Sequence, residues 1–127
     1  MRNLLWLPLY VASLVGQEQA QFDEPVKLEP IERFDGPVTV RTGSGGGTTR
    51  AVRVRIRTWG IPNRQRLVLP EQGYLVVRLI SGDLTTVSGE ARQQRKEGDF
   101  WTVPAGQQLM LETGRDTVTL SVVSISE

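Results

Sequence analysis

The chain has 127 residues, which is enough for one domain with one hydrophobic core. Its 39% hydrophobic and 23% charged residues are typical of a globular protein. Cysteine and histidine are absent, which excludes disulfides, thiol nucleophiles, Ser-His-Asp triads and imidazole metal ligands. We therefore expect a protein that is not an enzyme and has no cofactor. The net charge of +1 gives no global field that favours nucleic acid.

Residues 1–20 form a hydrophobic leader, in which Arg2 precedes an uncharged stretch from Leu4 to Gly16. This is the pattern of a secretory signal, and the stretch is too short to span a membrane as a helix. A cleaved leader would give a secreted or periplasmic protein. A retained leader would anchor the chain at the membrane interface or against a partner's membrane helices. The contact residues would then be Leu4, Leu5, Trp6, Leu7 and Tyr10. Either way, we expect the domain on the extracytoplasmic side of a bacterial inner membrane.

Residues 21–37 are polar and acidic and contain three prolines, which predicts an extended arm leading into a domain of residues 38–127. Residues 38–41 predict a short strand. The glycine-rich segment 42–50 predicts a mobile hairpin loop, because no Lys-Ser/Thr pair and no helix pattern follow it, as a phosphate-binding loop requires.

From residue 51 onward, the sequence predicts an all-β domain. Residues 51–59 alternate strictly, with Arg53, Arg55, Arg57 and Trp59 on one face and Val52, Val54, Ile56 and Thr58 on the other. Further strands are predicted over 65–69, 74–80, 84–88, 100–103, 107–112 and 117–125. Short strands with turns every 8–12 residues indicate a sandwich or a barrel.

A glycine and proline pattern over residues 65–125 resembles the cupin family. Gly98, Pro104 and Gly106 stand at the spacing of the family's second motif, and a buried strand that closes on Gly82 looks like the end of the first motif. The resemblance implies a cupin-like barrel, a jelly roll also called a double-stranded β-helix. The proline and glycine would form the tight corner where the chain crosses between sheets.

The resemblance lacks the family's metal ligands. Leu109 stands where metal-binding cupins carry a histidine, and Glu71 is the only acid between Gln65 and Leu75, where the first motif's ligands would lie. We therefore expect no metal site. The barrel interior would be a filled core or a small hydrophobic pocket. The possible pocket residues are Tyr74, Trp101, Gln107 and Leu109, and a cryptic enzyme would pair Tyr74 with a carboxylate such as Glu112.

The three alternating arginines are the most distinctive surface feature that the sequence predicts. Arg53, Arg55 and Arg57, with Trp59 at the end of the row, could bind a partner protein or an anion. They could instead protect an edge strand and pair with acids across the sheet.

The sequence leaves two main hypotheses for function. The first is a non-catalytic accessory or structural subunit of an extracytoplasmic membrane complex, such as a photosynthetic or respiratory one, with membrane protein subunits as partners. The alternative is a secreted or periplasmic module that binds a sugar or a small anion.

Overall fold

The computed structural model describes residues 22–41, 43 and 47–127, and the predicted leader lies outside these residues. Within them the protein is all-β, as predicted, and no helix there is long and apolar enough to cross a membrane. The strands are β1 (Ile31–Arg41), β2 (Thr49–Ile61), β3 (Arg66–Leu69), β4 (Tyr74–Ser81), β5 (Leu84–Ser88), β6 (Ala91–Arg95), β7 (Phe100–Val103), β8 (Leu109–Thr113) and β9 (Val118–Ser126).

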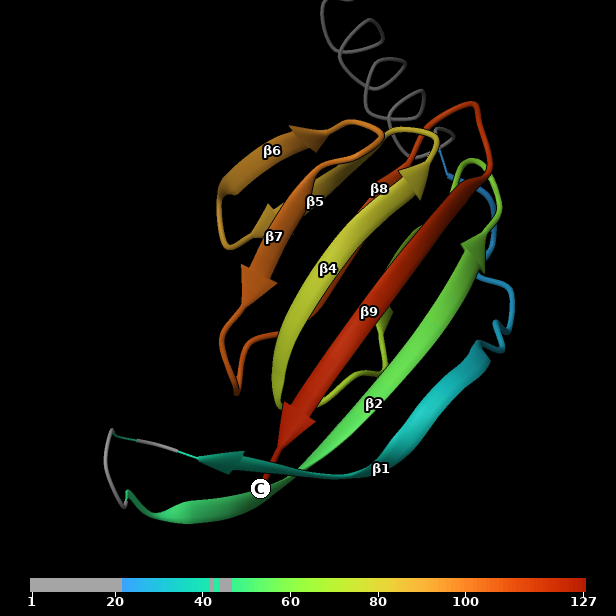
Figure 1. Ribbon diagram of the computed structural model, residues 1–127. Coiled ribbons are helices and arrows are strands. Elements are labelled where there is room, and N and C mark those ends of the chain that lie inside the picture. The colour runs from blue at the N-terminus through green and yellow to red at the C-terminus, as the bar shows by residue number, and fades with distance from the viewer. Residues whose placement is uncertain (1–21, 42, 44–46) are drawn as a thin grey trace, which may run out of the picture.

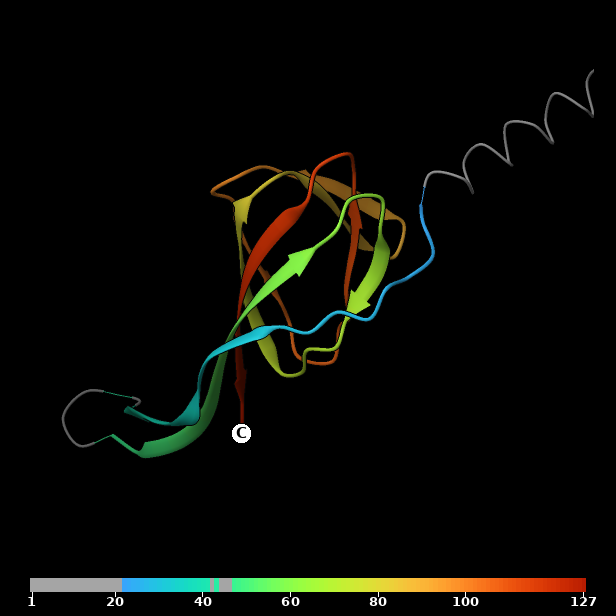
Figure 2. The same ribbon diagram turned by 90° about the vertical axis from the view of Figure 1, so that its right-hand side faces the viewer.

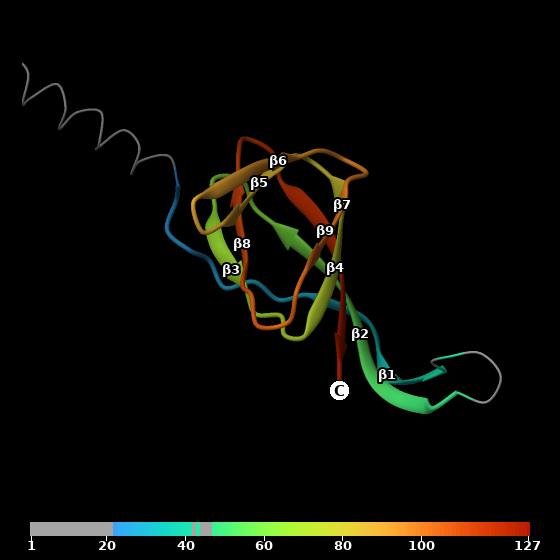
Figure 3. The ribbon, with the colours of Figure 1, turned by 90° about the vertical axis from the view of Figure 1, so that its left-hand side faces the viewer.

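The strands form two antiparallel sheets that face each other as the walls of a barrel (Figures 1 and 3). The five-stranded sheet has the order β1-β2-β9-β4-β7, and the four-stranded sheet has the order β3-β8-β5-β6. Strands that are consecutive in the chain therefore often lie in different sheets. The chain crosses between the sheets at turns, so these turns determine the architecture.

Apolar side chains from both sheets fill the interior of the barrel. Strand β9 alternates buried and half-buried residues, and β4 alternates buried residues with exposed or half-buried ones, as expected for strands with one face on a core. Residues that are no more than 2% exposed include Trp59, Leu75, Leu79, Leu111 and Leu120. Of the two interiors that the sequence allowed, the filled core is the one observed.

Three turns carry the glycines on which the cupin resemblance rests, and Gly82, Gly98 and Gly106 all have a positive φ. Gly82 has a φ of +87°, and a Cβ there would lie 2.7 Å from the carbonyl oxygen of Thr117, so only glycine fits. Pro104 accepts a hydrogen bond from the N–H of Gln107 at 3.1 Å, across a turn in which Gly106 has a φ of +89°. The expected corner between the sheets is therefore present.

The first strand is much longer than the sequence predicted. The predicted strand of residues 38–41 is the end of β1, which already begins at Ile31 within the predicted arm. Strand β1 pairs with β2 from Ile31 opposite Thr58 to Arg41 opposite Thr49. Proline did not stop the strand because β1 is at the edge of its sheet, where a missing N–H is tolerated.

Part of this β1–β2 hairpin projects beyond the barrel (Figure 2). Strand β9 pairs with β2 only from Arg53 to Ile61, so the β2 residues before Arg53 pair with β1 alone. The predicted hairpin is confirmed by the pairing of its two strands, although residues 42 and 44–46 of its loop lie outside the described part of the chain.

Candidate functional site

The arginine row on β2 pairs with acidic residues of the neighbouring strand. Arg53 donates two hydrogen bonds to the carboxylate of Asp35, at 2.9 and 2.8 Å. Arg55 contacts both Asp35 and Glu32, and Arg57 donates to Glu32 at 3.2 Å. The Arg53 hydrogen bond lowers the pKa of Asp35 below its ordinary value of 3.8. The cross-strand pairing that the sequence allowed is therefore present, but the edge strand is β1 and not β2 as expected, because β2 lies between β1 and β9.

The last residue of the predicted row, Trp59, is not on the surface. It is 1% exposed and belongs to the core, so the prediction that it extends an open patch is wrong. The alternating pattern separated the two faces of β2, but it did not show that the arginine face turns inward where β2 enters the barrel. There, Arg57 Nη1 and Trp59 Nε1 donate to the two carboxylate oxygens of Glu71, at 3.2 and 3.0 Å.

Burial of Glu71 raises the pKa of this carboxyl above its ordinary value of 4.5, and the hydrogen bond from Trp59 partly opposes the rise. At a pH just above 4.5, the folded protein therefore holds a proton that the unfolded chain has released. The free energy of unfolding must then fall as pH rises from 4.5 through the folded-state pKa.

We expect Glu71→Gln to remove this fall in stability. The lowered pKa of Asp35 acts in the opposite direction and at lower pH, because it gives stability that is lost as pH falls below 3.8. Urea unfolding from below pH 3.8 to neutrality, on the variant and the unmodified protein, separates the two effects. A decline above pH 4.5 that persists in Glu71→Gln would assign it to another group.

The four residues predicted as a pocket do not lie in one. Trp101 and Leu109 are 8% and 3% exposed and belong to the core. Tyr74 is 41% exposed, and Gln107 lies exposed in the turn before β8. The prediction of a pocket inside the barrel is wrong because leucine and tryptophan side chains fill that space. The predicted membrane or partner contacts Leu4, Leu5, Trp6, Leu7 and Tyr10 lie outside the described residues.

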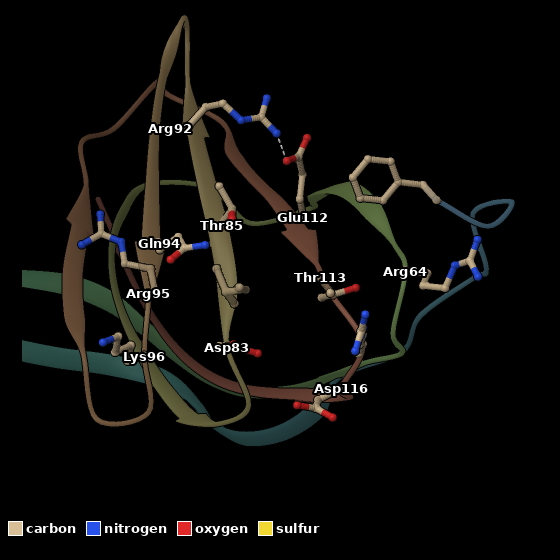
Figure 4. A pocket seen from close by; sticks show the side chains of 14 residues that line it. Arg64, Asp83, Thr85, Arg92, Gln94, Arg95, Lys96, Glu112, Thr113 and Asp116 are labelled. Atoms are coloured by element: carbon tan, nitrogen blue, oxygen red, sulfur yellow. Dashed lines mark hydrogen bonds and ion pairs between the residues drawn. The ribbon is translucent and has the colours of Figure 1, made fainter. Parts of the chain in front are cut away.

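A pocket of about 830 Å³ lies instead at one end of the barrel (Figure 4). The arm lines it at Phe22 and the β2–β3 turn lines it at Arg64. The other walls are the start of β5, strand β6 with the residue that follows it, and the end of β8 with the turn after it. Its volume is within the range of sites that bind small molecules. We take this barrel-end pocket as the candidate binding site.

A buried carboxylate lies in one wall of the barrel-end pocket. Glu112 on β8 is 6% exposed, and both of its oxygens are engaged by arginines. Arg66 on β3, directly opposite in the sheet, donates to Oε2 at 2.7 Å, and Arg92 on β6 donates to Oε1. Arg66 also stacks on the ring of Phe22, at 5.1 Å from the centroid. Glu112 thereby fixes two guanidinium groups on this face.

The sequence offered Glu112 as a carboxylate partner for Tyr74. The structure corrects this pairing, because no hydrogen bond joins the two described side chains and both Glu112 oxygens go to arginines. The sequence did place an arginine (Arg66) and a glutamate (Glu112) on two predicted strands. Only the β3–β8 register shows that these two residues lie opposite each other. No group of three His, Cys, Asp or Glu that could hold a metal occurs among the described residues.

Comparison with known proteins identifies the fold. No family model matches the sequence, and no curated protein matches it. Among solved structures, a cupin domain from Bordetella pertussis has a TM-score of 0.58 at 14% identity, over 83% of this chain and 99% of that one. A Cupin 2 conserved barrel domain protein from Salinispora arenicola has a TM-score of 0.58 at 14% identity, over 86% and 83% of the two chains.

A cupin superfamily protein from Desulfitobacterium hafniense is also similar, with a TM-score of 0.53 at 11% identity over 84% of this chain and 96% of that one. These likenesses confirm the cupin fold that the glycine and proline motif predicted. At such low identity they define the architecture alone, so function must be argued from this chain's own residues.

Proposed function

We propose that this cupin-fold chain is a non-catalytic accessory subunit that binds a larger protein complex through its projecting β1–β2 hairpin. The observation that carries the proposal is the outer edge of β1. This strand is at the end of the five-stranded sheet, so its edge has no neighbour within the described residues. It also exposes four large apolar side chains, Ile31, Phe34, Val38 and Val40, which are between 38% and 56% exposed.

An open strand edge with apolar side chains is a surface onto which a partner can add a strand. The same edge carries features that discourage unselective pairing, namely the charges of Glu32 and Arg33, the proline at 37 and a bulge between Glu32 and Phe34. A shallow groove at the base of the hairpin, between residues 35–37 and 51–53, adds further contact area. A complementary partner is therefore favoured over aggregation.

Three features support a binding role rather than catalysis. The chain has no cysteine or histidine. The barrel interior is filled with apolar side chains, and no candidate metal cluster occurs in the described part of the chain. The leader sequence is the basis for placing the protein on the extracytoplasmic face of a bacterial inner membrane, with membrane protein subunits of a complex such as a respiratory or photosynthetic one as partners.

The test compares a hairpin variant with a matched control in native membranes. Val38→Asp/Val40→Asp places two charges on the hairpin edge, and Val68→Asp/Ile80→Asp places two on similarly exposed residues elsewhere. We expect the unmodified chain to co-purify with membrane proteins at its full mass of 14.1 kDa. The hairpin variant should lose about tenfold or more of the co-purified protein, and the control should not, because charges cannot be buried at an apolar contact.

Circular dichroism of both variants establishes that they remain folded. A hairpin variant that retains its partners contradicts the proposal. So does a chain found only in the soluble extract and lighter by roughly 2 kDa, as loss of a leader of this length would give.

A further inference from the structure

The barrel-end pocket has a charge distribution that favours an anionic ligand. Its lining contains five basic and three acidic side chains, in a protein whose total net charge is only +1. The basic residues are Arg64, Arg92, Arg95, Lys96 and Arg115, and the acidic ones are Asp83, Glu112 and Asp116. Glu112 is already neutralised, because Arg66 reaches it from beside the pocket in addition to Arg92. Arg64 forms an ion pair with Asp23 of the arm. Among the charged groups that remain, Arg95, Lys96 and Arg115 outnumber Asp83 and Asp116, so a surplus of positive charge is available to a ligand.

Two of these arginines are held in place before any ligand arrives. Arg92 is fixed through Nη2 by the buried Glu112. Arg95 donates through Nε to Thr86 at 3.2 Å, and its guanidinium lies over the ring of Trp101, at 4.6 Å from the centroid. A guanidinium has five N–H donors, and these contacts use only part of each set. Pre-positioned donors bind a carboxylate or phosphate at a lower entropic cost than mobile ones.

Two further cations lie at the rim. The side chains of Lys96 and Arg115 form no ion pair with the described carboxylates and line the pocket from different walls. Lys96 follows β6, and Arg115 lies in the turn between β8 and β9. A bound anion could therefore be contacted from two sides.

The remaining polar side chains of the pocket are suited to hydrogen bonding with the hydroxyl groups of a ligand. Asp83 and Asp116 lie at the edge of the pocket near the β8–β9 turn, while Thr85 and Gln94 come from β5 and β6 (Figure 4). Carboxylate, amide and hydroxyl oxygens accept hydrogen bonds from the alcohol hydroxyls of a sugar, which inorganic anions lack. The ring of Phe22, which comes from the arm, adds an apolar surface to the lining of the pocket. The lining thus suits an anion that also carries hydroxyl groups.

We propose that the barrel-end pocket binds a small hydroxylated anion, such as a sugar bearing one carboxylate or one phosphate group. The arginines of β6 and the rim cations contact the anionic group, and the two aspartates accept from the hydroxyls. This site is separate from the β1–β2 hairpin, because neither strand contributes to the pocket lining. The proposal is therefore independent of the docking function.

The experiment is calorimetric titration of the full chain with four compounds. Glucuronate and glucose 6-phosphate carry both features, glucose carries only alcohol hydroxyls, and inorganic phosphate carries the charge without the alcohol hydroxyls of a sugar. We expect one or both of the acidic sugars to bind at least about tenfold more tightly than glucose and phosphate, because each lost charge-assisted hydrogen bond costs about a factor of ten or more. Preference between the two acidic sugars identifies carboxylate or phosphate as the anionic group.

The variant Lys96→Gln/Arg115→Gln tests the location. Both residues are exposed, so the fold should persist, and affinity should fall about tenfold. The matched control Lys27→Gln/Arg41→Gln removes two exposed charges that do not line the pocket and should bind like the unmodified protein. The proposal is overturned if no acidic sugar binds, if glucose or phosphate binds equally well, or if the two variants lose affinity alike.

Discussion

Replacing Trp59 with alanine is expected to lower the free energy of unfolding by about 3–5 kcal/mol. The side chain is 1% exposed and belongs to the core, so its removal leaves a large cavity there. The substitution also removes the N–H that donates to Glu71 at 3.0 Å. Because single domains are stable by only about 5–15 kcal/mol, this loss is a large fraction of the total.

The two components of the Trp59 effect can be separated with a second variant. Trp59→Phe keeps most of the apolar volume but removes the N–H, so we expect it to cost about 1.5–3 kcal/mol, the usual value of a hydrogen bond to a charged group. Urea unfolding followed by circular dichroism measures both variants. Phe100→Ala is the control, since this ring is 64% exposed. Equal losses for Trp59→Ala and Phe100→Ala would contradict the placement of Trp59 in the core.

The sequence was sufficient to predict the architecture and most strands, because both depend on local patterns. Strand β6 was missed because its residues are polar, none of them is buried, and they show no apolar alternation. Alternation identified β2 and β9, and the turn glycines identified the corners of the cupin fold. The start of β1 was missed because prolines usually end a strand, and only the position of β1 at the sheet edge makes Pro37 acceptable. That position depends on pairing with β2, which a local pattern does not show.

The candidate site was harder to predict because it depends on register between distant segments. Glu112 lies 46 residues from Arg66 and 20 from Arg92, and the β3–β8, β5–β8 and β5–β6 pairings bring the three together. Likewise, the inward turn of Trp59 depends on the pairing of β2 with β9. The sequence shows where the arginines stand in the chain, but it could not indicate which of them a neighbouring carboxylate neutralises.

The Glu112 cluster gives the second large expected effect. The double variant Arg66→Met/Arg92→Met should lower the free energy of unfolding by about 3–5 kcal/mol, because it leaves the carboxylate of Glu112 buried without a cation. The exposed fraction of the Glu112 side chain is only 6%, whereas the arginines are about half exposed. Each single variant should cost less than half of the double, since the remaining arginine still pairs with Glu112. The losses should therefore not be additive.

Two further variants assign this loss to the carboxylate. Arg53→Met breaks a surface pair in which the Arg53 side chain is 58% exposed, and we expect its cost to be small beside that of the double variant, because solvent screens an exposed pair. Adding Glu112→Leu to the double variant removes the buried charge itself and should recover most of the lost stability, because an apolar replacement of a buried ion cluster is often neutral. If the triple variant is no more stable than the double, the penalty lies in the lost packing of Arg66 against the Phe22 ring. If the triple variant regains the lost stability, the buried carboxylate of Glu112 lowers the free energy of unfolding of the protein. Such a cost is expected for a group whose role is to hold arginines in position for a ligand.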